Sequence, residues 1–191
     1  MMGNKFLLYG GIAVLVVICG LAFPLAFYYS KLPSEDVIKP GTSLTQLFSG
    51  FGKEFSSSIN GDEVPEAMLC LSCLPHARSS NDCTENMSSF IAKNLLTASR
   101  SMLFWHVSNA YLAKAIEMKY ETSTVRSIYF GMLANIFMKK DLSSLCMEKL
   151  GKSCGQLEAA DLRMLQRAFS SGKMPPPDVP TDEKYAACFS K

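Results

Sequence analysis

Apolar residues fill the opening stretch of the chain, residues 6–29, which contain no charged side chain. At a rise of ~1.5 Å per residue, a helix of this length spans the ~30 Å hydrocarbon core of a bilayer. The apolar run is longer than the core of a cleavable signal peptide, although Gly20-Leu21-Ala22 offers a cleavage triplet. The pattern predicts an uncleaved transmembrane signal-anchor helix at 6–29 behind a short tail at 1–5, with a cleaved signal peptide as the alternative.

Residues 30–65 show neither a long helical period nor the alternation of a strand. Proline and glycine interrupt this stretch repeatedly, and both residues favour turns and loops. Short apolar clusters at 44–48 and 51–55 could form a helical turn that lies on a membrane or on a folded domain. We therefore predict a flexible connector at residues 30–65, followed by a helical, cysteine-containing domain at residues 66–191.

Residues 76–129 form a long stretch that contains neither proline nor glycine. From Met87 onward, apolar residues recur every three or four positions, as on the buried face of an amphipathic helix. This spacing predicts a long helix, with Ser108-Asn109 as the place where it would break. The residues predicted to face inward are Met87, Ile91, Leu95, Ala98, Met102, Trp105, Leu112, Ile116 and Tyr120.

Three further helical segments are predicted after residue 121. The first ends at Lys139-Lys140, which suits the negative end of a helix dipole. Asp141 is the predicted N-cap of a second, short helix that ends at Leu150, before Gly151. The third covers residues 156–171, and no run of convincing strand period follows. The fold class is therefore all-α. The inward residues of the first and third segments are Val125, Ile128, Tyr129, Leu133, Ile136 and Phe137, then Leu157, Leu162, Leu165 and Phe169.

Cysteine usage suggests where the domain resides. One of the seven cysteines, Cys19, falls in the predicted span, which leaves an even number behind an anchor that could export them. Such a set is typical of a disulfide framework on the extracellular, lumenal or periplasmic side. We expect Cys188 to fasten the C-terminal tail to Cys146 or Cys154, because that tail has little apolar surface. The disulfide candidates are Cys70, Cys73, Cys83, Cys146, Cys154 and Cys188.

Two features bear on partners and modification. Asn86 begins an Asn-Met-Ser sequon and is a candidate glycosylation site in a secretory compartment. The formal charge of +2 is balanced, without the clustered Lys and Arg of a nucleic-acid binder. We therefore expect contact with a membrane and with an unidentified protein partner, and no nucleic acid.

Cys70-Leu71-Ser72-Cys73 supports two alternative functions. A CxxC pair is the redox motif of thiol-disulfide oxidoreductases, although no preceding strand is predicted here and nearby acidic residues would raise the thiol pKa. With His76 and Cys83, the same pair offers four soft ligands for tetrahedral Zn²⁺, in an unusual spacing. A membrane-tethered oxidoreductase and a zinc-binding module are therefore the alternatives.

Catalytic signals are otherwise weak. The chain has two histidines, His76 and His106, and neither a glycine-rich phosphate loop nor an HExxH run. We assign no catalytic residue and expect neither a cofactor nor a metal. The sequence thus favours a non-enzymatic, membrane-anchored binding or assembly subunit with an extracytosolic helical domain, stabilised by disulfides, that meets its partner through a helix face or through the anchor.

Overall fold

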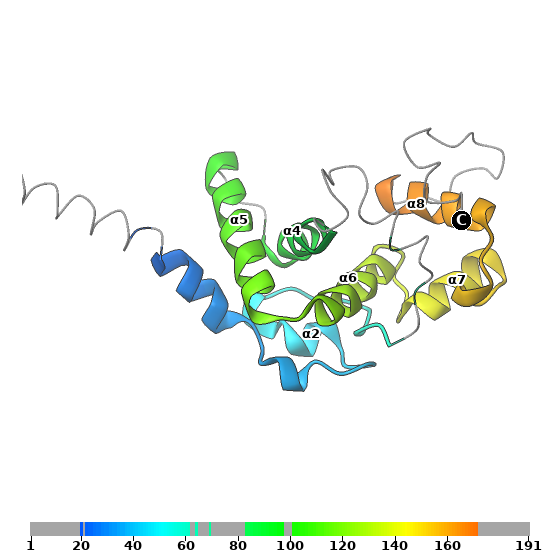
Figure 1. Ribbon diagram of the computed structural model, residues 1–191, viewed down its shortest axis with the longest axis horizontal. Coiled ribbons are helices and arrows are strands. Elements are labelled where there is room, and N and C mark those ends of the chain that lie inside the picture. The colour runs from blue at the N-terminus through cyan, green and yellow to red at the C-terminus, as the bar shows by residue number, and fades with distance from the viewer. Residues whose placement is uncertain are drawn as a thin grey trace, which may run out of the picture.

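The computed structural model describes residues 20, 22–61, 64, 69, 83–97 and 101–171 (Figure 1). Within these residues the regular elements are helices, and β pairing is limited to an isolated antiparallel bridge between Ser43 and Ser58. The all-α prediction is therefore confirmed for this part of the chain. After a helix at residues 22–31, the elements are η1 (Glu35–Val37), α2 (Leu44–Leu47), η2 (Ser49–Phe51), α4 (Cys83–Leu95), α5 (Met102–Lys119), α6 (Thr122–Ile136), α7 (Leu142–Leu150), η3 (Cys154–Gln156) and α8 (Ala159–Ser171).

The prediction of a single long helix is wrong, because the structure has two helices here. The first, α4, ends at Leu95, and the second, α5, begins only at Met102. The break does not fall at Ser108-Asn109, which lies buried within α5. Ser101 has an extended backbone, and its hydroxyl accepts a hydrogen bond from the amide of Phe104 at 3.3 Å. A serine in this role caps the start of a helix. The chain can therefore fold back, so that α4 packs against α5.

The main core lies where α4, α5 and α6 meet. Most of the residues predicted to face inward are buried there, and the ring of Phe90 packs edge-on against that of Tyr129 with centroids 5.0 Å apart. The sequence periods therefore identified most of this core correctly. Its fully buried large side chains from the three helices include Met87, Ile91, Leu95, Leu112, Ile116, Ile128, Phe130 and Met132.

Residues 32–60 also contribute to the core, and α2 (Leu44–Leu47) is the helical turn predicted in this stretch, packed here on the domain. Leu32, Leu44, Phe48 and Ile59 are buried together with the three helices. The division of the chain at residue 65 stays a prediction, but the ordered residues before it belong to the packed structure. Their scattered apolar positions have no helical period, because irregular backbone rather than a long helix presents them to the core.

Residues 56–60 lie directly on α6. The amide of Ser58 donates to the carbonyl of Lys140 at 2.8 Å, and the amide of Ser56 donates to Oδ1 of Asn135 at 2.7 Å. Close approach is possible because α6 has a glycine here: a Cβ at Gly131 would clash with the backbone carbonyl of Ser58. Glycine thus serves as a contact surface for another segment of backbone.

The helix α7 begins and ends where the sequence predicts. The Asp141 side chain accepts a hydrogen bond from the Ser144 amide at 2.8 Å, and Gly151 ends the helix in the left-handed conformation (φ 69°). The final predicted segment divides into η3 and α8, and its inward residues Leu162 and Leu165 are buried. Both the N-cap and the C-terminal glycine of α7 are local signals, which explains why the sequence predicted them.

Candidate functional site

Lys119, at the end of α5, holds the end of helix 22–31. Its ammonium group donates to the carbonyls of Tyr29 at 2.8 Å and Leu32 at 2.7 Å, and it lies 4.7 Å from the centre of the Tyr29 ring. The last carbonyls of a helix lack partners within the helix and carry partial negative charge, so a cation there is favourable. The side chain therefore caps the preceding helix from a different part of the fold.

Two further hydrogen bonds extend this junction. The Tyr120 hydroxyl donates to the carbonyl of Pro33 at 2.9 Å, and the amide of Glu121 donates to Oε1 of Glu35 at 2.9 Å. Burial, and then the nearby Glu35 and Tyr29, raise the pKa of Tyr120 far above its usual value, which keeps the hydroxyl protonated as a donor. We call residues 119–121, with their partners in residues 29–35, the clamp.

Packing accompanies these hydrogen bonds. Leu32 is buried, and Leu25 and Tyr28 on helix 22–31 pack against the core with part of their surface. Other residues of this helix face away from the protein: Phe23 is 74% exposed and Phe27 is 45% exposed. Helix 22–31 is thus fixed on one side by the domain and leaves an apolar side uncovered.

A second uncovered apolar surface lies at the start of α5. Met102, Leu103, Phe104 and Val107 are 73%, 75%, 64% and 44% exposed, and we call these four residues the α5 tip. Residues 101–113 contain no charged side chain, so the tip lacks the polar cover that a solvated helix end usually has. Exposed apolar residues gathered on one element are a mark of an interaction site.

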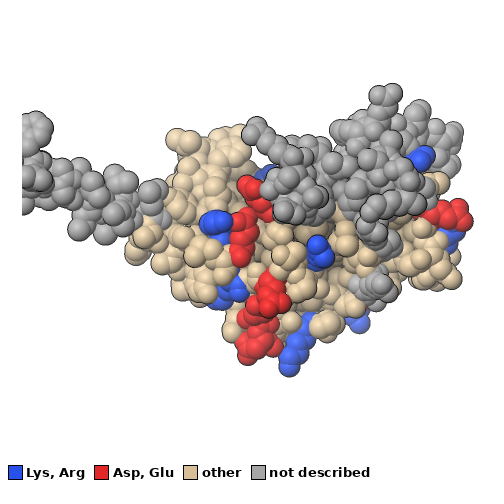
Figure 2. All heavy atoms as spheres, viewed as in Figure 1, with Lys and Arg blue, Asp and Glu red and all other residues tan. Residues whose placement is uncertain are grey.

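The predicted inward face is partly wrong at the α5 tip. Met102 continues the helical period yet is exposed, and Trp105 is only half-buried. The period is present, but the residues of the tip protrude beyond the core. Figure 1 shows α5 (green) rising from the core and helix 22–31 (blue) running to the upper left beside it, with the N-terminal ends of both helices directed away from the core. In Figure 2 the upper end of α5 carries no charge.

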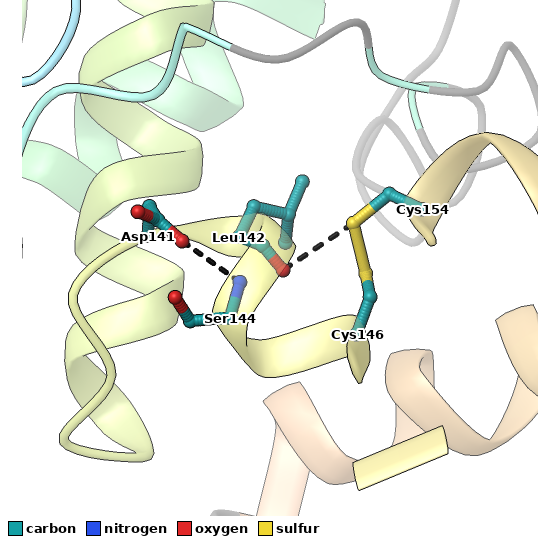
Figure 3. Close-up of a disulfide and its surroundings, with 5 residues drawn as sticks. All are labelled: Asp141, Leu142, Ser144, Cys146 and Cys154. Atoms are coloured by element: carbon teal, nitrogen blue, oxygen red, sulfur yellow. Dashed lines mark hydrogen bonds between the residues drawn. A yellow bond between two sulfur atoms is a disulfide. The ribbon is translucent and has the colours of Figure 1, made fainter. Parts of the chain in front are cut away.

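A disulfide closes the corner between α7 and η3. Cys146 and Cys154 are bonded with their Cα atoms 5.5 Å apart, and Sγ of Cys154 contacts the carbonyl oxygen of Leu142 at 3.3 Å (Figure 3). The expected bond from Cys188 to one of these residues is therefore wrong. The turn at Gly151 brings the two close neighbours in sequence together, so both are already paired; Cys188 lies outside the described residues.

Ion pairing supports the same corner. Lys152 donates to Oδ2 of Asp161 at 2.8 Å, and the amide of Glu158 donates to the same oxygen at 3.0 Å. Burial opposes ionisation of Asp161, but these hydrogen bonds outweigh it and lower its pKa. The corner is thus held by a covalent bond and by charge-assisted hydrogen bonds, and its residues suit structural support rather than reaction chemistry.

The remaining predicted site residues are described in part or not at all. Cys70, Cys73 and His76 lie outside the described residues, and Cys83 is placed only as the first residue of α4, without its side chain. The oxidoreductase and zinc hypotheses therefore stay untested predictions. Asn86 lies half-buried in the first turn of α4. The described part of the chain holds no cluster of three or more potential metal ligands.

The predicted membrane span falls mainly on residues that the structure does not describe. Over the described residues, no helix combines the length and apolar character needed to cross a bilayer. Comparisons with protein-family models, curated proteins and solved structures give no significant match. The clamp and the α5 tip are therefore the features from which a function can be argued.

Sequence reasoning identified neither feature. The clamp joins residues about 90 positions apart, and no local signal links Lys119 to Tyr29. The tip did have a signal, which is the uncharged run at 101–113 with its high content of apolar residues. The predicted inward face passed through this run at Met102 and Trp105, because periodicity does not reveal where the covering elements stop.

Proposed function

We propose that this chain is a membrane-anchored, non-enzymatic binding or assembly subunit whose helical domain presents a surface to a protein partner. The clamp is the observation that carries this proposal. An anchor connected through a flexible linker would leave the domain free to reorient, and ordering it would reduce the affinity for a partner. Because Lys119 fixes helix 22–31 against α5, a partner in the same membrane would meet a domain that is already oriented.

The disulfide supports a location outside the cytosol. Bonds such as Cys146–Cys154 persist in oxidising compartments and are rare among cytosolic proteins. The apolar run at residues 6–29 provides the means of export and of attachment. The proposed arrangement is therefore a single-pass anchor with the helical domain on the extracellular, lumenal or periplasmic side.

Attachment and sidedness can be measured on the full chain in cells or microsomes. We expect the chain to resist extraction by alkaline carbonate, and Cys146 and Cys154 to react with a thiol reagent only after reduction. Glycosylation at Asn86, read as a mobility shift on endoglycosidase treatment, would add to this result. Release of the chain by carbonate, or immediate alkylation of both cysteines, would contradict the proposed arrangement.

The binding role is tested through the clamp. Lys119→Met removes the ammonium group that holds helix 22–31, and Lys114→Met is the matched control, because Lys114 is a more exposed lysine of the same helix paired only with Glu117. We expect the wild-type chain and Lys114→Met to migrate in a discrete complex in native electrophoresis after mild detergent extraction. Lys119→Met should stay membrane-bound but lose much of that complex.

Two results would count against this role. One is a wild-type chain that migrates as a free monomer, and the other is a Lys119→Met variant that retains the whole complex. Circular dichroism of both lysine variants shows whether the helical fold is preserved, so that a loss of assembly is not mistaken for unfolding. The carbonate experiment reports attachment separately from assembly.

A further inference from the structure

We infer that the α5 tip inserts into the lipid bilayer, so that the domain itself touches the membrane that its anchor would cross. The inference rests on the proposed anchor and adds a second, separate membrane contact. It assigns a lipid surface as the occupant of Met102, Leu103, Phe104 and Val107, whose apolar side chains no described part of the protein covers.

The chemistry of the tip suits lipid. Helices that lie in a membrane interface bury large apolar side chains among the acyl chains and keep charged residues away from them. Residues 101–113 are uncharged, and Arg100 and Lys114 stand at the two ends of this run. Trp105, half-buried beside the tip, is of the type enriched at the level of lipid headgroups. Both the exposed and the flanking residues are therefore those of an interfacial segment.

The geometry places the tip on the side of the anchor. Residues 6–21 precede helix 22–31 in the sequence, so the proposed anchor would enter the bilayer from the N-terminal side of that helix. The clamp joins the C-terminal ends of the two helices at Tyr29 and Lys119, and from there α5 rises while helix 22–31 runs to the upper left in Figure 1, so that both N-terminal ends lie above the junction. At ~1.5 Å per residue, Met102 lies ~25 Å along α5 from Lys119, so the α5 tip extends well beyond the clamp.

A protein partner is the competing occupant of the tip. Protein interfaces usually surround an apolar centre with a polar rim that contributes hydrogen bonds. At the upper end of α5 only uncharged groups, such as the exposed Ser101 and His106, could contribute to such a rim, and the face shown in Figure 2 carries no charge there. With the proposed membrane on the same side, lipid requires no additional component, and we therefore assign the tip to the bilayer.

The chain carries its own probe, because Trp105 is its only tryptophan. The experiment reconstitutes the full chain into phosphatidylcholine vesicles, with or without bromine on the acyl chains, and measures tryptophan emission. Bromine quenches tryptophan emission by contact, so we expect a clear loss of emission in brominated lipid if the tip lies among the acyl chains. Acrylamide, dissolved in the water outside, should quench weakly.

The matched variants change exposed residues of one helix. Leu103→Gln combined with Phe104→Gln makes the tip polar, and Met118→Gln alters a residue that is 57% exposed at the opposite end of α5. We expect the double variant to lose most of the quenching by brominated lipid and to gain quenching by acrylamide, whereas Met118→Gln should behave as wild type. Because these side chains are exposed, the helix content by circular dichroism should not change.

Each result is decisive. A chain that resists carbonate but shows no quenching by brominated lipid retains its anchor and overturns the inference alone. Emission that is open to acrylamide in pure lipid vesicles would instead favour a protein occupant. Quenching that persists in the double variant would show that Trp105 approaches lipid without the tip. A chain released by carbonate would overturn both the anchor and the contact that rests on it.

Discussion

From Leu112 to Lys119, α5 is packed against the core and joined to helix 22–31, whereas from Met102 to Val107 its apolar side chains are exposed. Both halves contain apolar residues at helical spacing. They differ in what surrounds them, because other elements bury Leu112 and Ile116, whereas the described structure leaves the four residues of the α5 tip exposed. Hydrophobic patterning therefore identifies which residues need a neighbour, and tertiary structure decides whether the chain supplies it.

The largest expected effect contrasts one leucine from each half. Leu112→Ala should reduce the free energy of unfolding by about 2–5 kcal/mol, because it leaves a cavity at a fully buried site. Leu103→Ala should change it by less than about 0.5 kcal/mol, because that side chain is 75% exposed. Denaturant unfolding of the full chain in detergent, followed by circular dichroism, measures both. Equal losses would abolish the distinction between the two halves.

A smaller effect tests the packed side of the molecule through α6. Gly131→Ala should destabilise the protein by about 1–3 kcal/mol, because the added methyl group would clash with the carbonyl of Ser58. Helix propensity alone predicts the opposite, a gain of up to about 1 kcal/mol from removing an internal glycine. Gly155→Ala is the control, since a Cβ there would meet no neighbouring atom. A stabilised Gly131→Ala variant would show that residues 56–60 do not lie on α6.

The smallest effects compare two helix caps. Ser101→Ala at the α5 tip and Asp141→Ala at α7 should each cost about 1 kcal/mol near neutral pH, because each removes the acceptor of an amide hydrogen bond. The loss at Ser101 should weaken amide protection mainly in the first turn of α5. Hydrogen exchange in that turn and in α7 measures the two effects separately, and unchanged exchange in both would refute the assigned caps.

The stabilising effects of these two caps should respond differently to acidic pH. Hydrogen bonds from Ser144 lower the pKa of Asp141, so its carboxylate stabilises the fold above the unfolded-state pKa of about 4. As pH falls through the lowered folded-state pKa, protonation removes that contribution. The difference in stability between wild type and Asp141→Ala should therefore shrink below about pH 4, whereas the effect of Ser101→Ala should stay constant because serine does not titrate there.

What the sequence predicted well depends on short-range signals. Asp141 and Gly151 bound α7 through hydrogen bonds within a few residues, and the inward residues of α6 follow a regular period. The break between α4 and α5 was missed because Ser101, its capping residue, lies in a stretch whose apolar spacing continues across it. No proline or glycine marks that break.

The rest depends on contacts between distant segments. Leu44, at the start of the short helix α2, and Ile59, in irregular backbone, are both buried, and Gly131 on α6 leaves room for Ser58. The clamp requires Lys119 to meet carbonyls about 90 positions earlier in the chain. The α5 tip differs again, since the predicted period included only Met102 of its four residues, and Met102 is exposed rather than buried. Periodicity counts apolar positions and contains no information on the number of elements available to cover them.

The grip of Lys119 on helix 22–31 has a mechanical consequence. The clamp connects helix 22–31 to α5 through the Lys119 ammonium group, the buried Tyr120 hydroxyl and the Glu35 carboxylate, so a rotation of one helix is passed to the other. A bilayer that thickens or thins changes the tilt of a helix that crosses it. In the proposed arrangement, such a tilt would be passed through the clamp to α5, so that the thickness of the membrane would influence the orientation of the helix that carries the α5 tip.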